Sequence, residues 1–127
     1  MECTPRGGGN RLCEMLRYAT GVDLITAQVR AAVGDTVEGI EQKPYDGHWA
    51  EIILHADNAG IFSGLEIDST IPATVIEKDL WIKNGDKVNA FHGANDAIGT
   101  LVLKFDDSEA LESTILRINK YIKIHVC

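Results

Sequence analysis

The sequence predicts an α+β fold, in which two helices precede a small antiparallel β-sheet or barrel-like domain that ends with one helix and one strand. Residues 10–33 carry apolar side chains at helical spacing, whereas residues 36–105 carry short apolar runs separated by turn residues. Near the C-terminus, helical spacing returns for one segment. The change of composition near residues 34–36 predicts a boundary between residues 1–35 and residues 36–127.

The two N-terminal helices have recognisable start and stop signals. Asn10 is a candidate N-cap for the first helix, and Gly21 is a candidate C-terminal stop. The second helix is predicted over "DLITAQVRAAV", with Asp23 as its cap and Gly34 at its end. Residues 10–33 therefore form two consecutive helices in this prediction.

Five short runs predict strands: "HWAEIILHA", "GIFSGLEI", "ATVIEKDLWI", "KVNAFHG" and "IGTLVLKF". Asn84 and Gly85 between two of these runs predict a type I′ hairpin. The segment "DDSEALESTILRINKYI" predicts one continuous helix that is capped by Ser108 or Asp107. The alternating segment "IKIHV" then predicts a final strand.

Composition and charge exclude several classes of partner. The chain of 127 residues has a formal net charge of −7, which gives no electrostatic footprint for a phosphate backbone. Neither an apolar run of membrane-spanning length nor a signal-peptide pattern occurs in the sequence. The three cysteines have no pairing pattern. We therefore predict no nucleic-acid partner, no membrane partner and a cytoplasmic location.

The opening "MECTPRGGGNRLCEML" has the residue types of a phosphate or metal site. Glu2 and Thr4 lie two residues apart, so in an extended chain their side chains share one face. A carboxylate and a second oxygen ligand on one face suit a hard cation such as Mg²⁺.

An anion site is predicted directly after this pair. Arg6 has a guanidinium that binds phosphate or carboxylate through two parallel hydrogen bonds. Three glycines, Gly7, Gly8 and Gly9, let the backbone approach a ligand, and the helix start near Asn10 favours negative charge. The combination favours phosphoryl or acyl-phosphate chemistry. The alternative is that the glycines form only a flexible turn before the helix.

The stretch "ECTPRGGGNRL" followed by "ATGVDL" resembles the end of the ATP-grasp domain. The resemblance implies that Glu2 bridges magnesium ions on ATP and that Arg6 is the catalytic residue that contacts phosphate or an acyl phosphate. It also implies a substrate-facing loop that consists of Gly7, Gly8, Gly9 and Asn10. Thr4 departs from the family pattern, because it stands where the family has a magnesium-binding asparagine.

Residues 36–127 look like the C-terminal domain of ATP-grasp carboxylate–amine ligases, such as L-amino-acid ligases. The similar stretches are "AGIFSGLEI", "KNGDKV" and "AIGTLVLKF". The resemblance implies that residues 1–35 are the remnant of an ATP-grasp domain and that the chain is the C-terminal part of a larger ligase. That parent would use ATP, Mg²⁺ and small carboxylate and amine substrates, together with upstream ATP-grasp and N-terminal domains. The isolated chain is expected to be inactive and to bind no cofactor tightly.

Two alternatives stay open at this point. The segment "GHWAEIILHADN" is similar to a segment of biotin carboxylases, which would make this the C-terminal domain of a carboxylase. In that pattern Ile53 occupies the position of the arginine that serves carboxylation, which is a departure. The other alternative is a non-catalytic module whose β-rich region covers an active site or mediates dimerisation. Separately, if the chain is a piece of a larger protein, we expect the apolar faces of the helices at 10–19 and 23–33 to be exposed and to drive self-association.

Overall fold

The computed structural model of the chain describes residue 9, residues 11–41 and residues 43–127. The chain divides into two compact units, residues 1–48 and residues 49–127. This division lies downstream of the change of composition near residue 35, because the connector contacts the first helix. The backbone N–H of Asp46 donates to the carbonyl of Ala19 at 2.8 Å, which ties the connector to the first unit.

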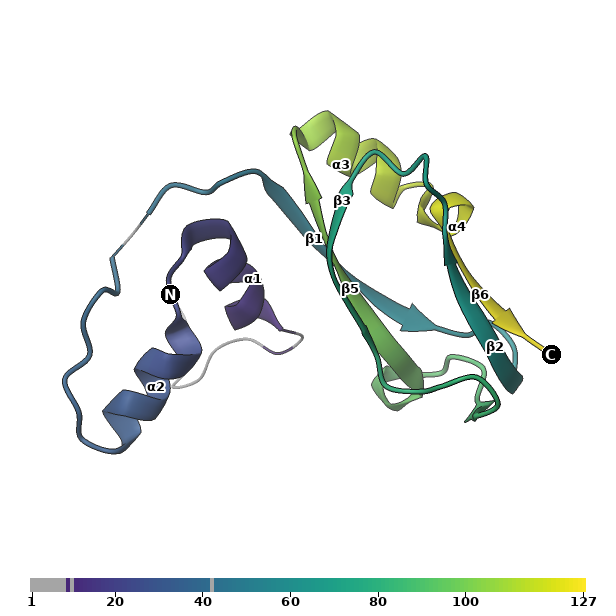
Figure 1. Cartoon of the computed structure of the whole chain (residues 1–127), viewed down its shortest axis with the longest axis horizontal. Coiled ribbons are helices and arrows are strands. Elements are labelled where there is room, and N and C mark those ends of the chain that lie inside the picture. Colours follow the sequence, from purple (N-terminus) through teal and green to yellow (C-terminus); the bar gives the residue numbers. More distant parts are fainter. Residues whose placement is uncertain (1–8, 10, 42) are drawn as a thin grey trace. The chain divides into compact units, whose positions relative to one another are not determined.

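The first unit contains two helices, α1 (Leu12–Thr20) and α2 (Leu24–Ala32) (Figure 1). The predicted stop at Gly21 is confirmed, since its φ is 75° and its N–H donates to the carbonyl of Arg17 at 2.8 Å. Helix α1 begins after Arg11, one residue later than the predicted cap. The predicted cap of α2, Asp23, is confirmed by the hydrogen bond from the Thr26 N–H to its carboxylate at 2.9 Å.

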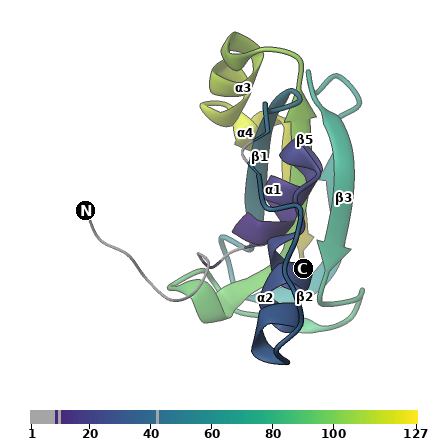
Figure 2. The same cartoon turned by 90° about the vertical axis from the view of Figure 1, so that its left-hand side faces the viewer.

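The second unit contains six strands and short helices. In chain order they are β1 (His48–His55), β2 (Gly60–Ile67), β3 (Thr74–Leu80), β4 (Lys87–Val88), η1 (Ala94–Asp96), β5 (Ala97–Phe105), α3 (Ser108–Ile115), α4 (Ile118–Tyr121) and β6 (Ile122–Val126). The strands form two three-stranded sheets with the orders β1-β5-β3 and β4-β2-β6. Figure 2 shows β5 between β1 and β3, and in both views α3 and α4 lie together at one end of the strands.

The predicted α+β class is confirmed, and the sheets have the predicted antiparallel character. Strand β3 runs antiparallel to β5, and both β4 and β6 run antiparallel to β2. Among the residues that the structure describes, the strand pairs give two separate sheets and close no barrel.

The core of the second unit lies between these strands and is centred on β5. The side chains of Leu101, Leu103 and Phe105 are at most 1% exposed and pack with Phe62 of β2. Gly99 of β5 faces β3 so closely that a Cβ there would meet the carbonyl oxygen of Asp79. The central strand therefore lies very close to β3 at this position.

The predicted hairpin at Asn84 and Gly85 is wrong. Strand β3 pairs with β5 while β4 pairs with β2, so this turn connects two sheets instead of two paired strands. The turn closes through the Asp86 N–H, which donates to the Lys83 carbonyl at 3.1 Å. Gly85 has a φ of 98°, but Asn84 is not among the residues with positive φ. A type I′ turn needs positive φ at both positions, so the backbone here resembles type II.

The predicted single C-terminal helix is also wrong, because the helix is interrupted at residues 116–117. The predicted cap at Asp107 is confirmed by the Ala110 N–H at 2.7 Å. The chain leaves helical geometry at Arg117, where φ is −126°, and Leu116 is 79% exposed. The interruption turns the chain so that Ile118 packs against the core and β6 can pair with β2 from Ile122 onward. The predicted final strand is confirmed.

Candidate functional site

Most of the site that the sequence predicts lies outside the described residues. These are Glu2, Thr4, Arg6, Gly7, Gly8 and Asn10. Gly9 is the one predicted site residue that the structure describes, and it is exposed with no atom within 4 Å of the position of a Cβ. The predicted roles of these residues therefore stay predictions, while the structure describes the helical segment that comes directly after them in the chain.

The start of α1 is shaped by an unusual backbone conformation at Arg11. Its φ is 57°, and no other described non-glycine residue has a positive φ. The Gly9 carbonyl accepts a hydrogen bond from the Leu12 N–H at 3.4 Å, which closes a turn just before the helix. The side chain of Arg11 pairs with Glu14, with 3.6 Å between Nε and Oε1. Sequence reasoning gave Arg11 no role, and no composition signal marks its left-handed backbone.

The cap residue of α1, Arg11, does not provide a side-chain cap hydrogen bond. Helix N-termini carry backbone N–H groups and a partial positive charge, both of which attract anions. The glycine-rich segment leads directly to this helix end, where the carboxylate in the first turn, Glu14, is paired with Arg11. This arrangement is compatible with the predicted phosphate-binding role of the segment.

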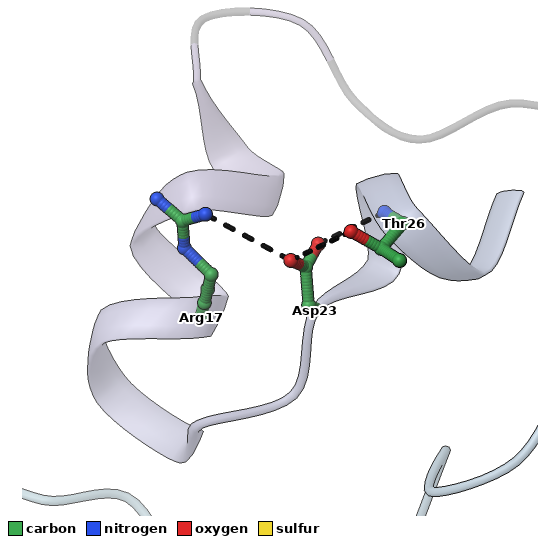
Figure 3. A network of polar contacts seen from close by, with 3 residues as sticks. All are labelled: Arg17, Asp23 and Thr26. Carbon is green, nitrogen blue, oxygen red and sulfur yellow. Dashed lines mark hydrogen bonds and ion pairs between the residues drawn. The ribbon is translucent and has the colours of Figure 1, made fainter. Parts of the chain in front are cut away.

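The corner between α1 and α2 is fixed by a local polar network (Figure 3). The Thr20 hydroxyl donates to the Leu16 carbonyl at 2.6 Å and accepts from the Val22 N–H at 3.2 Å. The carboxylate of Asp23 then accepts from both the backbone N–H and the hydroxyl of Thr26, each at 2.9 Å. The segment "TGVDL" is therefore a helix stop followed at once by a helix start.

Charge reinforces this corner. The Arg17 guanidinium lies 3.8 Å from the Asp23 carboxylate, and the two groups come from different sides of the corner. Hydrogen bonds from Thr26, first from its N–H and then from its hydroxyl, hold the pKa of Asp23 below its ordinary 3.8, and the charge of Arg17 lowers it further. The carboxylate is thus ionised at neutral pH and fixes the direction in which α2 leaves α1.

The first unit also contains a mainly apolar cavity of about 260 Å³. The helix side of this cavity is formed by Leu16, Val22 and Leu24, and the connector side by Ile40 and Tyr45. Ile40 is 52% exposed and Tyr45 is 74% exposed, so the connector covers the helices only loosely. Sequence reasoning treated the connector as a simple linker and missed its part in this cavity.

The carboxylase-like segment forms β1 and the turn after it. Ile53, at the position of the carboxylase arginine, is 39% exposed. His55 stacks on Phe91 with ring centroids 4.2 Å apart, and its Nδ1 lies 3.9 Å from the Asp57 carboxylate. Among the described residues, no group of three or more histidine, cysteine or acidic side chains could hold a metal ion. Within the same residues, no helix has the length and apolarity to cross a membrane.

Comparison with known proteins addresses the fold. No protein-family model matches the chain, and no curated protein matches it. Solved structures do match it, among them two ligases. Phosphoribosylglycinamide synthetase from Anaerococcus prevotii matches over 98% of this chain and 32% of its own, with a TM-score of 0.72 and 18% identity. L-amino acid ligase from Bacillus licheniformis matches over 91% of this chain and 29% of its own, with a TM-score of 0.69 and 11% identity.

The chain has the fold of a part of these two ligases. The resemblance that the sequence predicted is thereby confirmed at the level of fold. The chain spans about a third of the length of these two ligase structures. Identities this low carry information about the fold alone, so substrates, cofactors and the reaction are matters for proposal.

Proposed function

We propose that this chain is part of an ATP-dependent carboxylate–amine ligase that works through an acyl phosphate. The observation that carries the proposal is the ligase-like fold over nearly the whole chain, joined to the segment "ECTPRGGGN" directly before α1. In such a reaction a substrate carboxylate oxygen attacks the γ-phosphorus of ATP and ADP leaves. The amine then attacks the acyl carbon, phosphate leaves, and the amine loses a proton.

The proposed roles of the residues follow from their chemistry. Glu2 and Thr4 offer a carboxylate and a hydroxyl, an oxygen donor set that suits Mg²⁺, which supplies charge neutralisation on the phosphates when it is bound. Arg6 stabilises the negative charge that develops during phosphoryl transfer. Gly7, Gly8, Gly9 and Asn10 form the loop that positions the substrate, and the uncapped start of α1 adds a favourable field for its anionic group.

The remaining active-site parts are proposed to come from upstream ATP-grasp and N-terminal domains of a longer chain, in a cytoplasmic enzyme. The isolated 127 residues are therefore expected to show no turnover and no tight binding of ATP or Mg²⁺. The matched ligase structures are about three times as long as this chain, which supports the proposal that further domains supply the rest of the active site.

The test is phosphate release from ATP by the longer parent chain across a panel of amino acids. We expect amino-acid-dependent release that Arg6→Ala lowers by at least about 100-fold, as for the loss of a group that stabilises transition-state charge. Arg30→Ala is the matched control, because Arg30 is an exposed arginine of α2. Release that depends on bicarbonate instead of amino acids would favour the carboxylase alternative. Release that is indifferent to Arg6→Ala would contradict the proposed role of this residue.

A specific observation also favours self-association as a second function. Ile25 and Val29 of α2 and Val33, the residue that caps its C-terminus, recur every four residues and are 43%, 59% and 71% exposed. Side chains four apart share one helix face, so they form an apolar stripe. We propose that this stripe packs against a second copy to form a homodimer.

Sedimentation of the chain at rising concentration tests the homodimer. We expect association that Val29→Asp abolishes and Gln28→Asp leaves unchanged, because Gln28 is also exposed on α2 but lies outside the stripe. A monomer at every concentration, or a dimer that survives Val29→Asp, would contradict this interface.

A further inference from the structure

The second unit contains a cavity of about 210 Å³ that is separate from the segment at residues 2–10. One of its walls is apolar and is made by Ile52 and Leu54 of β1, Ile118 of α4, and Ile122 and Ile124 of β6. All five side chains also belong to the core or pack against it. The wall is therefore held in place by the fold, and it can receive an apolar group without first being ordered.

Opposite charges line the same cavity. Asp57, which lies just after β1, and Lys123 of β6 are both among the residues that line it. The Asp57 side chain is 88% exposed and lies 3.9 Å from His55 Nδ1, beyond hydrogen-bond distance. Lys123 also lies near Asp68, which is not part of the cavity lining. Hydrogen bonds from Thr70 are the main cause of the lowered pKa of Asp68, and the positive charge of Lys123 lowers this pKa further. The lining thus includes one acidic and one basic residue beside the apolar residues.

The backbone around the cavity also has hydrogen-bonding capacity. Strand β1 is the edge of one sheet and β6 is the edge of the other, and both strands contribute to the lining. Edge strands carry backbone N–H and C=O groups that point away from the sheet and pair with added polar groups. A small polar ligand here can therefore use backbone groups as well as the two charged side chains.

We propose that this cavity binds a small apolar amino acid in its zwitterionic form. Asp57 pairs with the ammonium group of the ligand, Lys123 pairs with its carboxylate, and the isoleucine wall receives its side chain. The volume is below the roughly 300–1,000 Å³ of pockets for larger ligands, which limits the ligand to the size of leucine or isoleucine. The site differs from the proposed catalytic segment in its residues, and its occupation requires neither ATP nor Mg²⁺.

The test is a titration of the isotope-labelled 127-residue chain with leucine, monitored by backbone NMR. We expect saturable shifts confined to residues 52–57 and 118–124. Two analogues separate the contributions: 4-methylpentanoic acid lacks the amine, and 3-methylbutylamine lacks the carboxylate. Each analogue should bind about tenfold more weakly than leucine, because each lacks one charge-assisted contact.

Matched substitutions locate the site. Asp57→Asn and Lys123→Met should each weaken leucine binding about tenfold and leave the remaining spectrum intact. Asp106→Asn and Lys120→Met remove exposed charges of the same sign outside the cavity and should leave binding unchanged. The proposal is overturned if leucine causes no saturable shift at tens of millimolar. It is also overturned if either analogue binds as tightly as leucine, or if the cavity and control variants behave alike. Because ATP is absent, failure here is distinct from failure of the ligase assay.

Discussion

The two units of this chain differ in how completely their apolar side chains are buried. In the second unit, eight buried residues from β1, β2, β4 and β5 and from the turn after β1 form a continuous core. In the described part of the first unit, the buried apolar residues are two alanines, Ala19 and Ala27. Some of its larger apolar side chains, such as Leu16 and Leu24, are only half-buried, and others are exposed, with Val33 at 71% and Tyr45 at 74%.

The two units are therefore stabilised by different kinds of interaction. The second unit is stabilised mainly by burial, which contributes on the order of 25 cal/mol per Å² of apolar surface and acts between strands that are distant in sequence. The first unit is ordered mainly by local hydrogen bonds at helix ends, such as those at Gly21 and Asp23. Local bonds define the direction of a chain but supply little stability without packing. We therefore expect the second unit to fold cooperatively. We expect the stability of the first unit to depend on what packs against its exposed apolar side chains.

The largest expected effect comes from the core of the second unit. Phe105→Ala removes a side chain that is 1% exposed, and we expect it to lower the free energy of unfolding by about 3–5 kcal/mol. Val33→Ala in the first unit should change it by less than about 0.5 kcal/mol, because that side chain is mostly in solvent. Denaturant unfolding monitored by tryptophan fluorescence measures the second unit, which contains Trp49 and Trp81, and backbone NMR of residues 24–32 measures the first. Equal losses for the two variants would contradict the contrast between the units.

The same contrast explains which parts of the fold could be predicted from the sequence. Helix stops and caps depend on residues within four positions, so the roles of Gly21, Asp23 and Asp107 were correctly predicted. Strand pairing depends on distant residues. The Asn84–Gly85 signal correctly indicated a turn but could not reveal that β4 pairs with β2. No glycine or proline marks the interruption of the helix at Arg117. The interruption accompanies the pairing of β6 with the distant strand β2, which a local pattern cannot reveal.

The candidate site shows the same division. The residue types at Glu2, Thr4 and Arg6 gave a chemical hypothesis without any structure, and those positions lie outside the described residues. The cavity between β1 and β6 could not be predicted, because Asp57 and Lys123 are distant in sequence and come together only through the fold. The residues of one segment can suggest a chemistry, which stays a prediction, whereas a site that joins two sheets depends on the fold.

A smaller effect is expected at the close contact between β5 and β3. Gly99→Ala places a methyl group against the Asp79 carbonyl and the Leu80 backbone, and the strands must separate to accept it. We expect a loss of about 1–3 kcal/mol in the free energy of unfolding, as for overpacking in a core. Gly93→Ala is the control, because its φ of 177° suits any residue and no atom lies within 4 Å of its Cβ position. Equal stability of the two variants in the same unfolding assay would show that this contact relaxes freely.

The smallest expected effect is local and lies at the α1–α2 corner. Because folding lowers the pKa of Asp23, ionised Asp23 stabilises the native corner above its ordinary pKa of 3.8, and this contribution is lost as the pH falls through the lowered value. We expect the Cα chemical shifts of residues 24–32 to move toward coil values below that pH. Asn is as good a cap as Asp but does not titrate in this range, so Asp23→Asn should keep the helix and flatten the profile.

Two further variants test whether Asp23 is the group that causes the pH dependence of α2. Asp23→Ala should weaken α2 at every pH, because it removes the acceptor for the Thr26 N–H and hydroxyl. Asp35→Asn, beyond the end of α2, should leave the profile of the natural chain unchanged. If Asp23→Asn kept the full pH dependence, a different group would control α2. In every variant the tryptophan signal of the second unit should stay constant, since its core contains none of these contacts.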